Sequence, residues 1–161
     1  MISVNDLKTF SYFNGFSDTE LEKLTTVATE ETHDAGVQIY KSGDPARSLF
    51  MVQEGKVILV MDSNLGPHKP PMQVTVDVVT RGESMGWSAV VEPHFYTLGA
   101  LCIDRVKAIA LDAPGLRRLM DCDACLGYRI MKATAQIIAN RLTHTRIILV
   151  GERGLSTLTE Y

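Results

Sequence analysis

The stretch that decides the fold is GVQIYKSGDPARSLFMVQEGKV, which spans residues 36–57. Two short β-prone runs flank a Ser-Gly-Asp-Pro turn at 42–45, and a Glu-Gly-Lys turn at 54–56 leads into a third run. Glycine supplies the positive φ that such turns need at no steric cost. We therefore interpret Gly43 and Gly55 as turn residues that connect consecutive strands, not as ligand contacts.

The β-prone character extends outward from this stretch over residues 36–111. In the run 72–79, Val74, Val76 and Val78 alternate with polar residues, which is the two-residue period of a half-buried strand. Because no helical pattern intervenes, the region predicts an antiparallel barrel or sandwich and not a parallel doubly wound sheet. The expected strands are 37–40, 49–53, 56–61, 72–79, 97–103 and 105–111.

Helical patterns flank the β region on both sides. Residues 3–30 carry apolar side chains three or four positions apart, and Ser17 with Glu20 is a capping-box signature. On the other side, Asp112 is a good N-cap for a hinge helix, and a long helix is expected from about 123 to about 150. The expected organisation is a single domain over 1–161, with helices at 3–30, the β region at 36–111 and the hinge and C-terminal helices at 113–150.

The long helix carries two adjacent ridges. We expect one ridge to pack on the β domain and the other, a heptad seam, to meet a second copy of the chain in a homodimer. The alternative is a helix that lies entirely on its own domain. The seam consists of Tyr128, Met131, Ala135, Ile138, Leu142, Thr145 and Leu149, and the neighbouring ridge of Ile130, Thr134, Ile137, Arg141, His144 and Ile148.

Composition excludes several classes of protein. The chain has 161 residues, 45% hydrophobic and 22% charged, which is typical of a globular domain. Its net charge of −3 argues against a general nucleic-acid or membrane-surface binder. Neither a signal peptide nor a membrane-spanning run is recognisable, and three cysteines are too few for a secreted disulfide framework. We expect a cytoplasmic protein that does not associate with membranes.

Three segments of the chain resemble a known family of domains. They are residues 36–57, the entry segment FNGFSDTEL at 13–21 and the Gly-Glu-Ser-Met-Gly run at 82–86. The family that they resemble is the cyclic-nucleotide-binding domain of the catabolite-activator and fumarate–nitrate-regulator superfamily. The resemblance covers nearly the whole chain. It implies a jelly-roll-like antiparallel β-roll, a short hinge helix and a long dimerisation helix. The DNA-binding half of such regulators has no counterpart here, because too few residues follow Val150 for a helix-turn-helix. We therefore expect no direct contact with DNA.

The resemblance also assigns residues 86–97 to the family's phosphate-binding cassette. In the family, a short helix after the glycine offers free backbone N–H groups to the cyclic phosphate. A glutamate directly after the glycine binds the ribose, and an arginine about ten residues later pairs with the phosphate. Here Trp87 replaces the glutamate and Tyr96 the arginine (Phe95 or Thr97 if the register slips by one). We therefore expect weak or no binding of cyclic AMP.

Candidate ligand contacts follow from this cassette and from the C-terminal helix. The ligand itself is unknown: the cassette indicates a nucleotide-like or other anionic small molecule. Trp87 either stacks on a flat ligand or plugs the pocket, and Arg141 either replaces the missing charge or is an exposed helix arginine. In the family, a threonine equivalent to Thr145 reaches the purine. The candidates are Gly86, Trp87, Ser88, Ala89, Tyr96, Thr97, Arg141 and Thr145.

Other reactive side chains form no convincing site. Cys122 and Cys125 have CxxC spacing, which we interpret as structural, with a redox-responsive pair as the alternative. His94 is interpreted as a loop-surface residue rather than a ligand, and no metal or catalytic spacing occurs. We expect a non-enzymatic, dimeric sensor of a small ligand. The alternative is a ligand-free interaction module whose pocket is closed by Trp87 and Tyr96.

Overall fold

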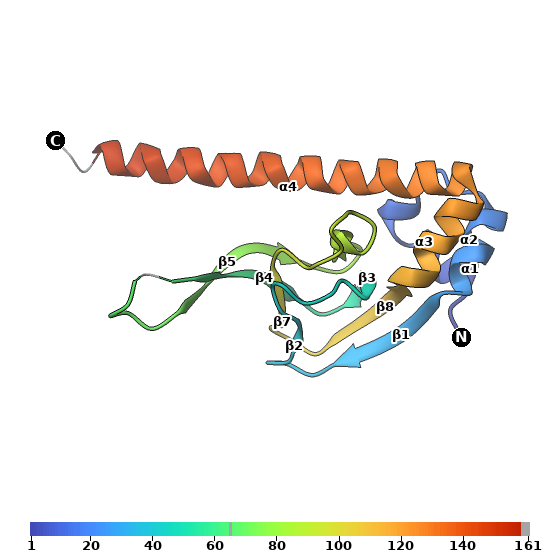
Figure 1. Ribbon diagram of the computed structural model, residues 1–161, viewed down its shortest axis with the longest axis horizontal. Helices are drawn as coiled ribbons and strands as arrows, with labels where there is room; N and C mark the ends of the chain where they lie inside the picture. Colours follow the sequence, from blue (N-terminus) through green and yellow to red (C-terminus); the bar gives the residue numbers. More distant parts are fainter. Residues whose placement is uncertain (65, 159–161) are drawn as a thin grey trace.

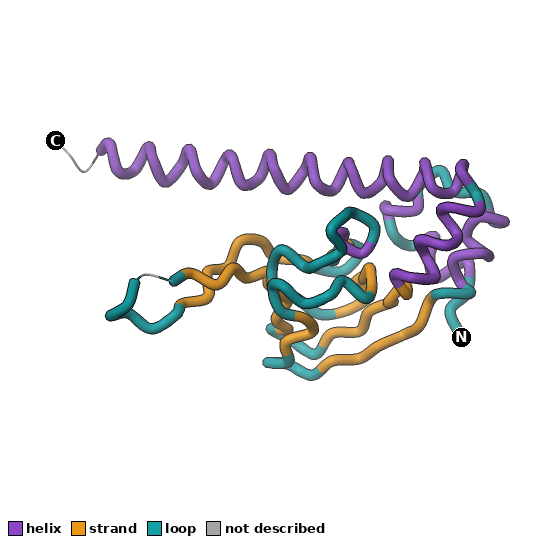
Figure 2. Tube along the Cα trace, viewed as in Figure 1, coloured by secondary structure: helices purple, strands orange, loops and turns teal. Residues whose placement is uncertain are grey.

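A computed structural model describes residues 1–64 and 66–158, with side chains up to Gly151. Helices cover one end of a two-sheet β structure, and one long helix runs along its side (Figure 1). Figure 2 shows the same arrangement by element type, with the strands in the middle of the chain. In chain order the elements are α1 (Val4–Lys8), η1 (Ser11–Phe13), α2 (Asp18–Thr25), β1 (Ala28–His33), β2 (Gln38–Tyr40), β3 (Ser48–Glu54), β4 (Val57–Ser63), β5 (Met72–Val79), β6 (Ser84–Met85), η2 (Trp87–Ala89), β7 (Gly99–Cys102), β8 (Val106–Asp112), α3 (Ala113–Cys122) and α4 (Ala124–Leu158).

The strands form two four-stranded antiparallel sheets. One has the order β1-β8-β3-β6 and the other β2-β7-β4-β5. The core lies between the sheets and beneath the helices, and includes Leu49, Met51, Leu59 and Ile109, which are at most 1% exposed. The predicted antiparallel β-roll with flanking helices is confirmed.

The glycines at the two turns have the predicted backbone conformation. Gly43 and Gly55 have φ of 88° and 87°. A Cβ atom on Gly55 would lie 2.4 Å from the carbonyl oxygen of Arg105, so that turn also requires the absence of a side chain. The sequence stretch that decides the fold therefore places its glycines where no other residue fits without strain.

Two expectations about the secondary structure were wrong in detail. The helical prediction over 3–30 runs too far, because α2 ends at Thr25 and β1 starts at Ala28. Thr25, Thr26 and Val27 are β-branched and therefore favour extended backbone, and β1 pairs with β8 along its whole length. The two-residue strand β6 was also missed, because it is too short to show a period.

The regular alternation predicted for 72–79 is also wrong. The pairing register of β5 with β4 shifts between Leu59 and Val60, where Asp77 and Thr75 are the partners and Val76 is the extra residue of a bulge. Val74 and Val78 are 41% and 42% exposed, whereas the side chain of Asp77 is only 19% exposed. Asp77 lies two residues from the buried Val79 and shares its face of the strand, so the polar side of the predicted alternation is the side that faces the roll and α4.

The hinge and C-terminal helices begin as predicted. The side chain of Asp112 accepts a hydrogen bond from the backbone of Gly115, which makes it the N-cap of α3. The long helix α4 starts at Ala124, directly after Asp123, and extends to Leu158, eight residues past the predicted end. On its predicted packing ridge Ile130 and Thr134 are fully buried, whereas Ile148, near the far end, is 43% exposed.

A buried tyrosine ties the N-terminal segment to α4. The Tyr12 hydroxyl lies 2.9 Å from Oγ1 of Thr134 and donates to the carbonyl oxygen of Ile130 at 3.3 Å. Burial raises the pKa of the Tyr12 phenol far above its ordinary value, so the group stays a neutral hydrogen-bonding hydroxyl. Tyr12 therefore fixes η1 against the first third of α4.

We expect Tyr12→Phe to lower the free energy of unfolding by about 1–2 kcal/mol. The substitution removes the hydrogen bond and leaves a buried threonine hydroxyl without its partner. Urea unfolding measures the change. As a control, Tyr128→Phe, at a position that is 66% exposed, should change the stability by less than about 0.5 kcal/mol. Equal effects of the two substitutions would show that the Tyr12 hydroxyl has no structural role.

Candidate functional site

The cassette begins with a left-handed glycine. Gly86 has φ 82° and ψ 33° and precedes the single turn of η2. A Cβ atom at Gly86 would lie 3.0 Å from the carbonyl oxygen of Ser48 and 3.2 Å from the ring of Tyr96. The backbone of the cassette turn thus packs directly against β3 and against the side chain of Tyr96.

Tyr96 occupies the interior beside this turn. Its hydroxyl donates to the carbonyl oxygen of Ser48 at 2.7 Å and accepts from the Ser48 N–H at 3.1 Å. Its ring stacks on Tyr40 with a centroid separation of 3.6 Å, and the Tyr40 ring stacks in turn on Phe50. Burial raises the pKa of Tyr96, so the phenol supplies no charge. Where the resemblance implies an arginine, the structure has a neutral tyrosine whose ring belongs to an aromatic stack and whose hydroxyl is hydrogen-bonded to Ser48.

The other cassette candidates differ in their exposure. Ser88 and Ala89 are buried, whereas Trp87 is partly exposed and Thr97 is exposed. The carbonyl oxygen of Ser88 lies 3.1 Å from Nδ1 of His94, and that of Ala89 accepts a hydrogen bond from Arg117 of α3 at 2.8 Å. The backbone carbonyl groups of the cassette turn are therefore contacted by His94 and by Arg117 of the hinge helix α3.

Arg141 connects α4 to the strands that lead into the cassette. Its guanidinium donates to the carbonyl oxygen of Ser84 at 2.8 Å, and its Nε lies 3.4 Å from a carboxylate oxygen of Asp77. The other Asp77 oxygen lies 3.6 Å from Nδ1 of His144. The side chain of Arg141 is only 20% exposed, so it is not a solvated helix arginine. We call Asp77, Ser84, Arg141 and His144 the α4 latch.

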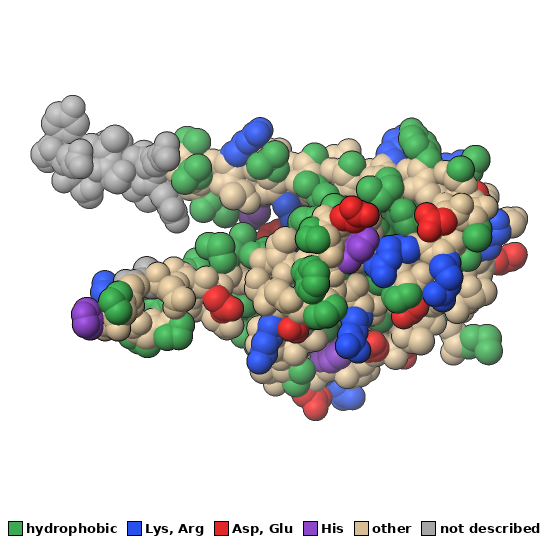
Figure 3. All heavy atoms as spheres, viewed as in Figure 1, with side chains coloured by type: hydrophobic (Ala, Val, Ile, Leu, Met, Phe, Trp, Pro, Cys, Tyr) green, Lys and Arg blue, Asp and Glu red, His purple; other side chains and the backbone are tan. Residues whose placement is uncertain are grey.

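The heptad seam of α4 is exposed in the single chain. Tyr128 is 66% exposed, and Met131, Leu142 and Leu149 are 41–48% exposed. Thr145, the candidate purine contact, lies on the same exposed seam. Hydrophobic side chains also line the visible part of α4 and the β4–β5 hairpin in Figure 3. One face of a long helix is thus apolar and uncovered.

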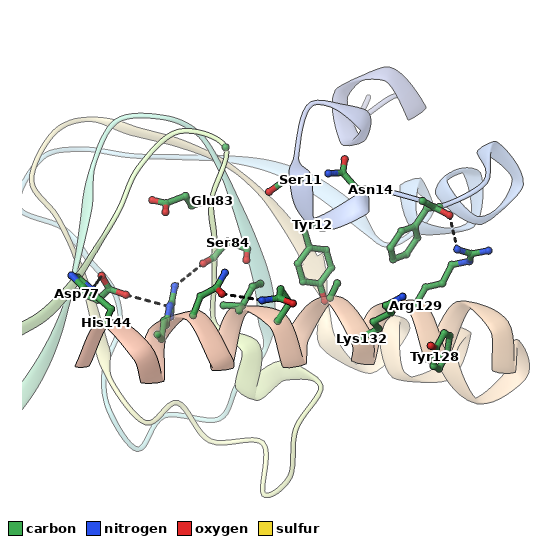
Figure 4. Close-up of a pocket in the computed structure, with 18 of the residues that line it drawn as sticks. Ser11, Tyr12, Asn14, Asp77, Glu83, Ser84, Tyr128, Arg129, Lys132 and His144 are labelled. Carbon is green, nitrogen blue, oxygen red and sulfur yellow. Dashed lines mark hydrogen bonds and ion pairs between the residues drawn. The ribbon is translucent and has the colours of Figure 1, made fainter. Parts of the chain in front are cut away.

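A groove of about 690 Å³ lies between α4, η1 and the segment that joins β5 to β6. Figure 4 shows its side chains: Tyr128, Arg129 and Lys132 at one end and Asp77 and His144 at the other. No residue of the cassette lines it. We call it the α4 groove, and its lining on α4 is Tyr128, Arg129, Lys132, Ala133, Gln136, Ile137, Asn140, Arg141 and His144.

Of the predicted site residues, Arg141 alone lines this groove, because the others lie in the cassette or on the seam. Sequence reasoning did not find the groove. The available signal was the polar row Lys132, Gln136, Asn140 and His144, spaced four residues apart on one face of the helix.

The remaining reactive groups form no site in the described part of the chain. Over residues 1–64 and 66–151, no group of three or more His, Cys, Asp or Glu side chains is placed to hold a metal ion. Cys102 is buried, whereas Cys122 and Cys125 are exposed and unbridged at the junction of α3 and α4. Among the described helices, none is long and apolar enough to cross a membrane.

The two-sheet roll, the left-handed glycine before a single helical turn and the long helix behind it define a cyclic-nucleotide-binding type of domain. Residues 30–123 match the family model described as the cyclic nucleotide-binding domain, and the chain belongs to that family. This confirms the resemblance inferred from the sequence motifs.

Solved structures share the fold. The chain is similar to a protein of Geobacter metallireducens GS-15 described as a cyclic nucleotide-binding protein, with a TM-score of 0.78 and 25% identity over 88% of this chain and 99% of that one. It is also similar to the catabolite activator protein of Thermus thermophilus, with a TM-score of 0.67 and 20% identity over 86% of this chain and 61% of that one.

One relative found by sequence comparison is named as a glutaminase, not as a cyclic nucleotide-binding protein. Over 130 residues the chain is 30% identical to glutaminase 1 of Bradyrhizobium diazoefficiens. The match covers 80% of this chain but only 19% of the glutaminase. The chain thus spans about a fifth of the length of this relative.

Proposed function

We propose that the chain is a non-enzymatic regulatory domain that has kept the cyclic-nucleotide-binding fold but does not bind cyclic AMP tightly, and that it acts as a cytoplasmic homodimer through α4. The family is a ligand-sensing regulatory one. The sequence contains no recognisable spacing of catalytic residues, which supports a non-enzymatic role. The small number of cysteines supports a cytoplasmic location.

The observation that carries the proposal is the place of Tyr96. A cyclic phosphate needs a charge-assisted partner, and a buried arginine–phosphate contact contributes roughly 1.5–3 kcal/mol. Tyr96 offers no charge, and its hydroxyl proton is donated to the Ser48 carbonyl while the oxygen accepts from the Ser48 N–H. Trp87 replaces the ribose acceptor as well, so two of the family's polar ligand contacts have no substitute in the cassette.

Dimerisation is supported by the exposed seam. A helix about 50 Å long cannot bury its length on one small roll, and apolar side chains at heptad spacing fit a second helix of the same kind. In the proposed mechanism, a ligand or partner shifts the balance between arrangements of α4 on the roll, because the latch joins α4 to the strand before the cassette.

Isothermal titration calorimetry with cyclic AMP tests the proposal that the cassette does not bind this nucleotide tightly. We expect no binding tighter than about 100 μM, because the charged contacts are missing. A dissociation constant in the low micromolar range, equivalent to about −8 kcal/mol, would contradict the proposal. Cyclic GMP, which carries the same cyclic phosphate and ribose, is titrated in parallel as the comparison nucleotide.

The stacked tyrosines favour a second candidate function. If Tyr96 and Tyr40 permanently fill the ligand position, the domain is a ligand-free interaction module that works through its surfaces. Thermal-shift measurements with nucleotides, other small anions and haem distinguish the two functions. A ligand that binds the folded state raises the melting temperature and supports the sensor, whereas the interaction module shows no shift with any of them.

A further inference from the structure

The α4 groove is separate from the cassette and almost separate from the seam. Of the seam residues only Tyr128 lines it, and the other six lie outside its lining. The groove therefore stays accessible when the seam is covered by a second helix and when the cassette is empty or filled. The groove is therefore a binding site distinct from the dimer seam and from the cassette.

The shape of the groove indicates an elongated occupant. Its lining on α4 runs from Tyr128 to His144, which spans about 24 Å at 1.5 Å per residue. A volume of about 690 Å³ spread over that length gives a narrow channel. Ser11, Asn14, Lys132, Gln136 and Asn140 on its walls are exposed, so the occupant remains partly in solvent. An extended peptide of about seven residues has this length and thickness.

The charged side chains of the groove indicate which way round a peptide would lie in it. Arg129 is already paired with Glu20 at 3.0 Å, and Arg141 is paired with Asp77. Lys132 has no carboxylate within 4 Å among the described side chains, and its Nζ lies 6.0 Å from the centre of the Tyr128 ring. At the β5–β6 turn, Glu83 accepts hydrogen bonds from the backbone and side chain of Thr80. The groove thus has a free cation at one end and a carboxylate toward the other.

Carboxamide side chains line the space between these ends. Gln136 donates to the Asn140 side-chain oxygen at 2.9 Å, which leaves the Gln136 oxygen and the Asn140 amino group available. Asn14, directly after η1, supplies a third carboxamide to the lining (Figure 4). Such amide groups form paired hydrogen bonds with peptide backbone, which presents a donor and an acceptor at each residue.

We propose that the α4 groove binds an extended peptide segment of a partner protein, of about seven residues, with an acidic side chain at Lys132. The far end of the peptide lies next to the α4 latch, since Asp77, Ser84, Arg141 and His144 also line the groove. Binding therefore fastens α4 to the roll at the strand that leads into the cassette.

Selection of phage-displayed random heptapeptides on the full chain tests the proposal, followed by fluorescence polarisation with the synthesised consensus peptide. We expect a consensus with Asp or Glu near one end, and at least 10-fold weaker binding to Lys132→Glu. Arg146→Glu, an exposed α4 position outside the groove, should change the affinity less than twofold. Lys132→Gln provides a second variant without charge reversal, and circular dichroism checks that each variant folds.

Amide shifts in NMR spectra locate the bound peptide. We expect shifts at residues 11–16 and 132–144 and none at residues 86–97. The proposal is overturned if no acidic consensus is enriched, if the consensus peptide binds Lys132→Glu as tightly as wild type, or if the shifts fall in the cassette. Because cyclic AMP plays no part in these measurements, their outcome is distinct from that of the cassette titration.

Discussion

We expect Ile138→Glu combined with Leu142→Glu to leave the chain monomeric at micromolar concentration, because these residues lie on the proposed dimer seam. Leu142 is 48% exposed and Ile138 is half-buried in the single chain, and both lie on the heptad seam. A symmetric dimer would bury four introduced carboxylates without partners. We expect dimer affinity to fall at least about 1,000-fold, or about 4 kcal/mol.

Multi-angle light scattering measures the mass directly. Gln136→Glu with Asn140→Glu adds the same charge to the opposite side of α4 and should leave the dimer intact, because both residues are exposed and lie off the seam. A wild-type chain that is already monomeric would contradict the seam hypothesis, as would a charged seam variant with the wild-type mass.

We expect Trp87→Glu combined with Tyr96→Arg to create a binding site for cyclic AMP. The two substitutions restore a ribose acceptor and a phosphate cation in the cassette, each worth roughly 1.5–3 kcal/mol as a charge-assisted contact. We expect the affinity measured by calorimetry to rise by about 100-fold or more over wild type. Removal of the tyrosine also vacates the space beside Gly86 that its ring now fills.

The matched control keeps the glutamate without the cation. Trp87→Glu with Tyr96→Phe retains an aromatic ring against Tyr40 and adds a lone carboxylate, so it should bind cyclic AMP no better than wild type. If the arginine variant folds, by circular dichroism, and still binds no tighter than the control, then Tyr96 is not what closes the cassette to nucleotides.

The fold was predictable because its signals are local. The glycines at 43 and 55, the capping box at Ser17 and the heptad of α4 each depend on residues close together in sequence, and all of them appear as predicted. The start of β1 was not predictable in the same way. Its apolar spacing continues that of α2, and only pairing with β8, almost 80 residues later, selects the strand.

The candidate site was less predictable because its geometry is not local. Arg141 was identified as a possible anion contact, but its partner Asp77 lies on β5, more than 60 residues earlier in the chain. The prediction took Val74 and Val78 as the buried face of this strand and so assigned Asp77 to solvent, whereas the structure exposes the valines and half-buries the aspartate. The α4 groove joins η1, the β5–β6 segment and α4, so no single window of sequence contains it.

The α4 latch makes the end of the helix a long lever. Arg141 is held by Ser84, two residues before the glycine that opens the cassette, and 17 residues of helix follow it to Leu158. That arm is about 26 Å long, so a tilt of about 10° at Arg141 moves its tip by roughly 4–5 Å. A change in one hydrogen bond at β6 would thereby become a displacement nearly as large as the pitch of one helical turn at the end of α4, and a partner bound there would move with it.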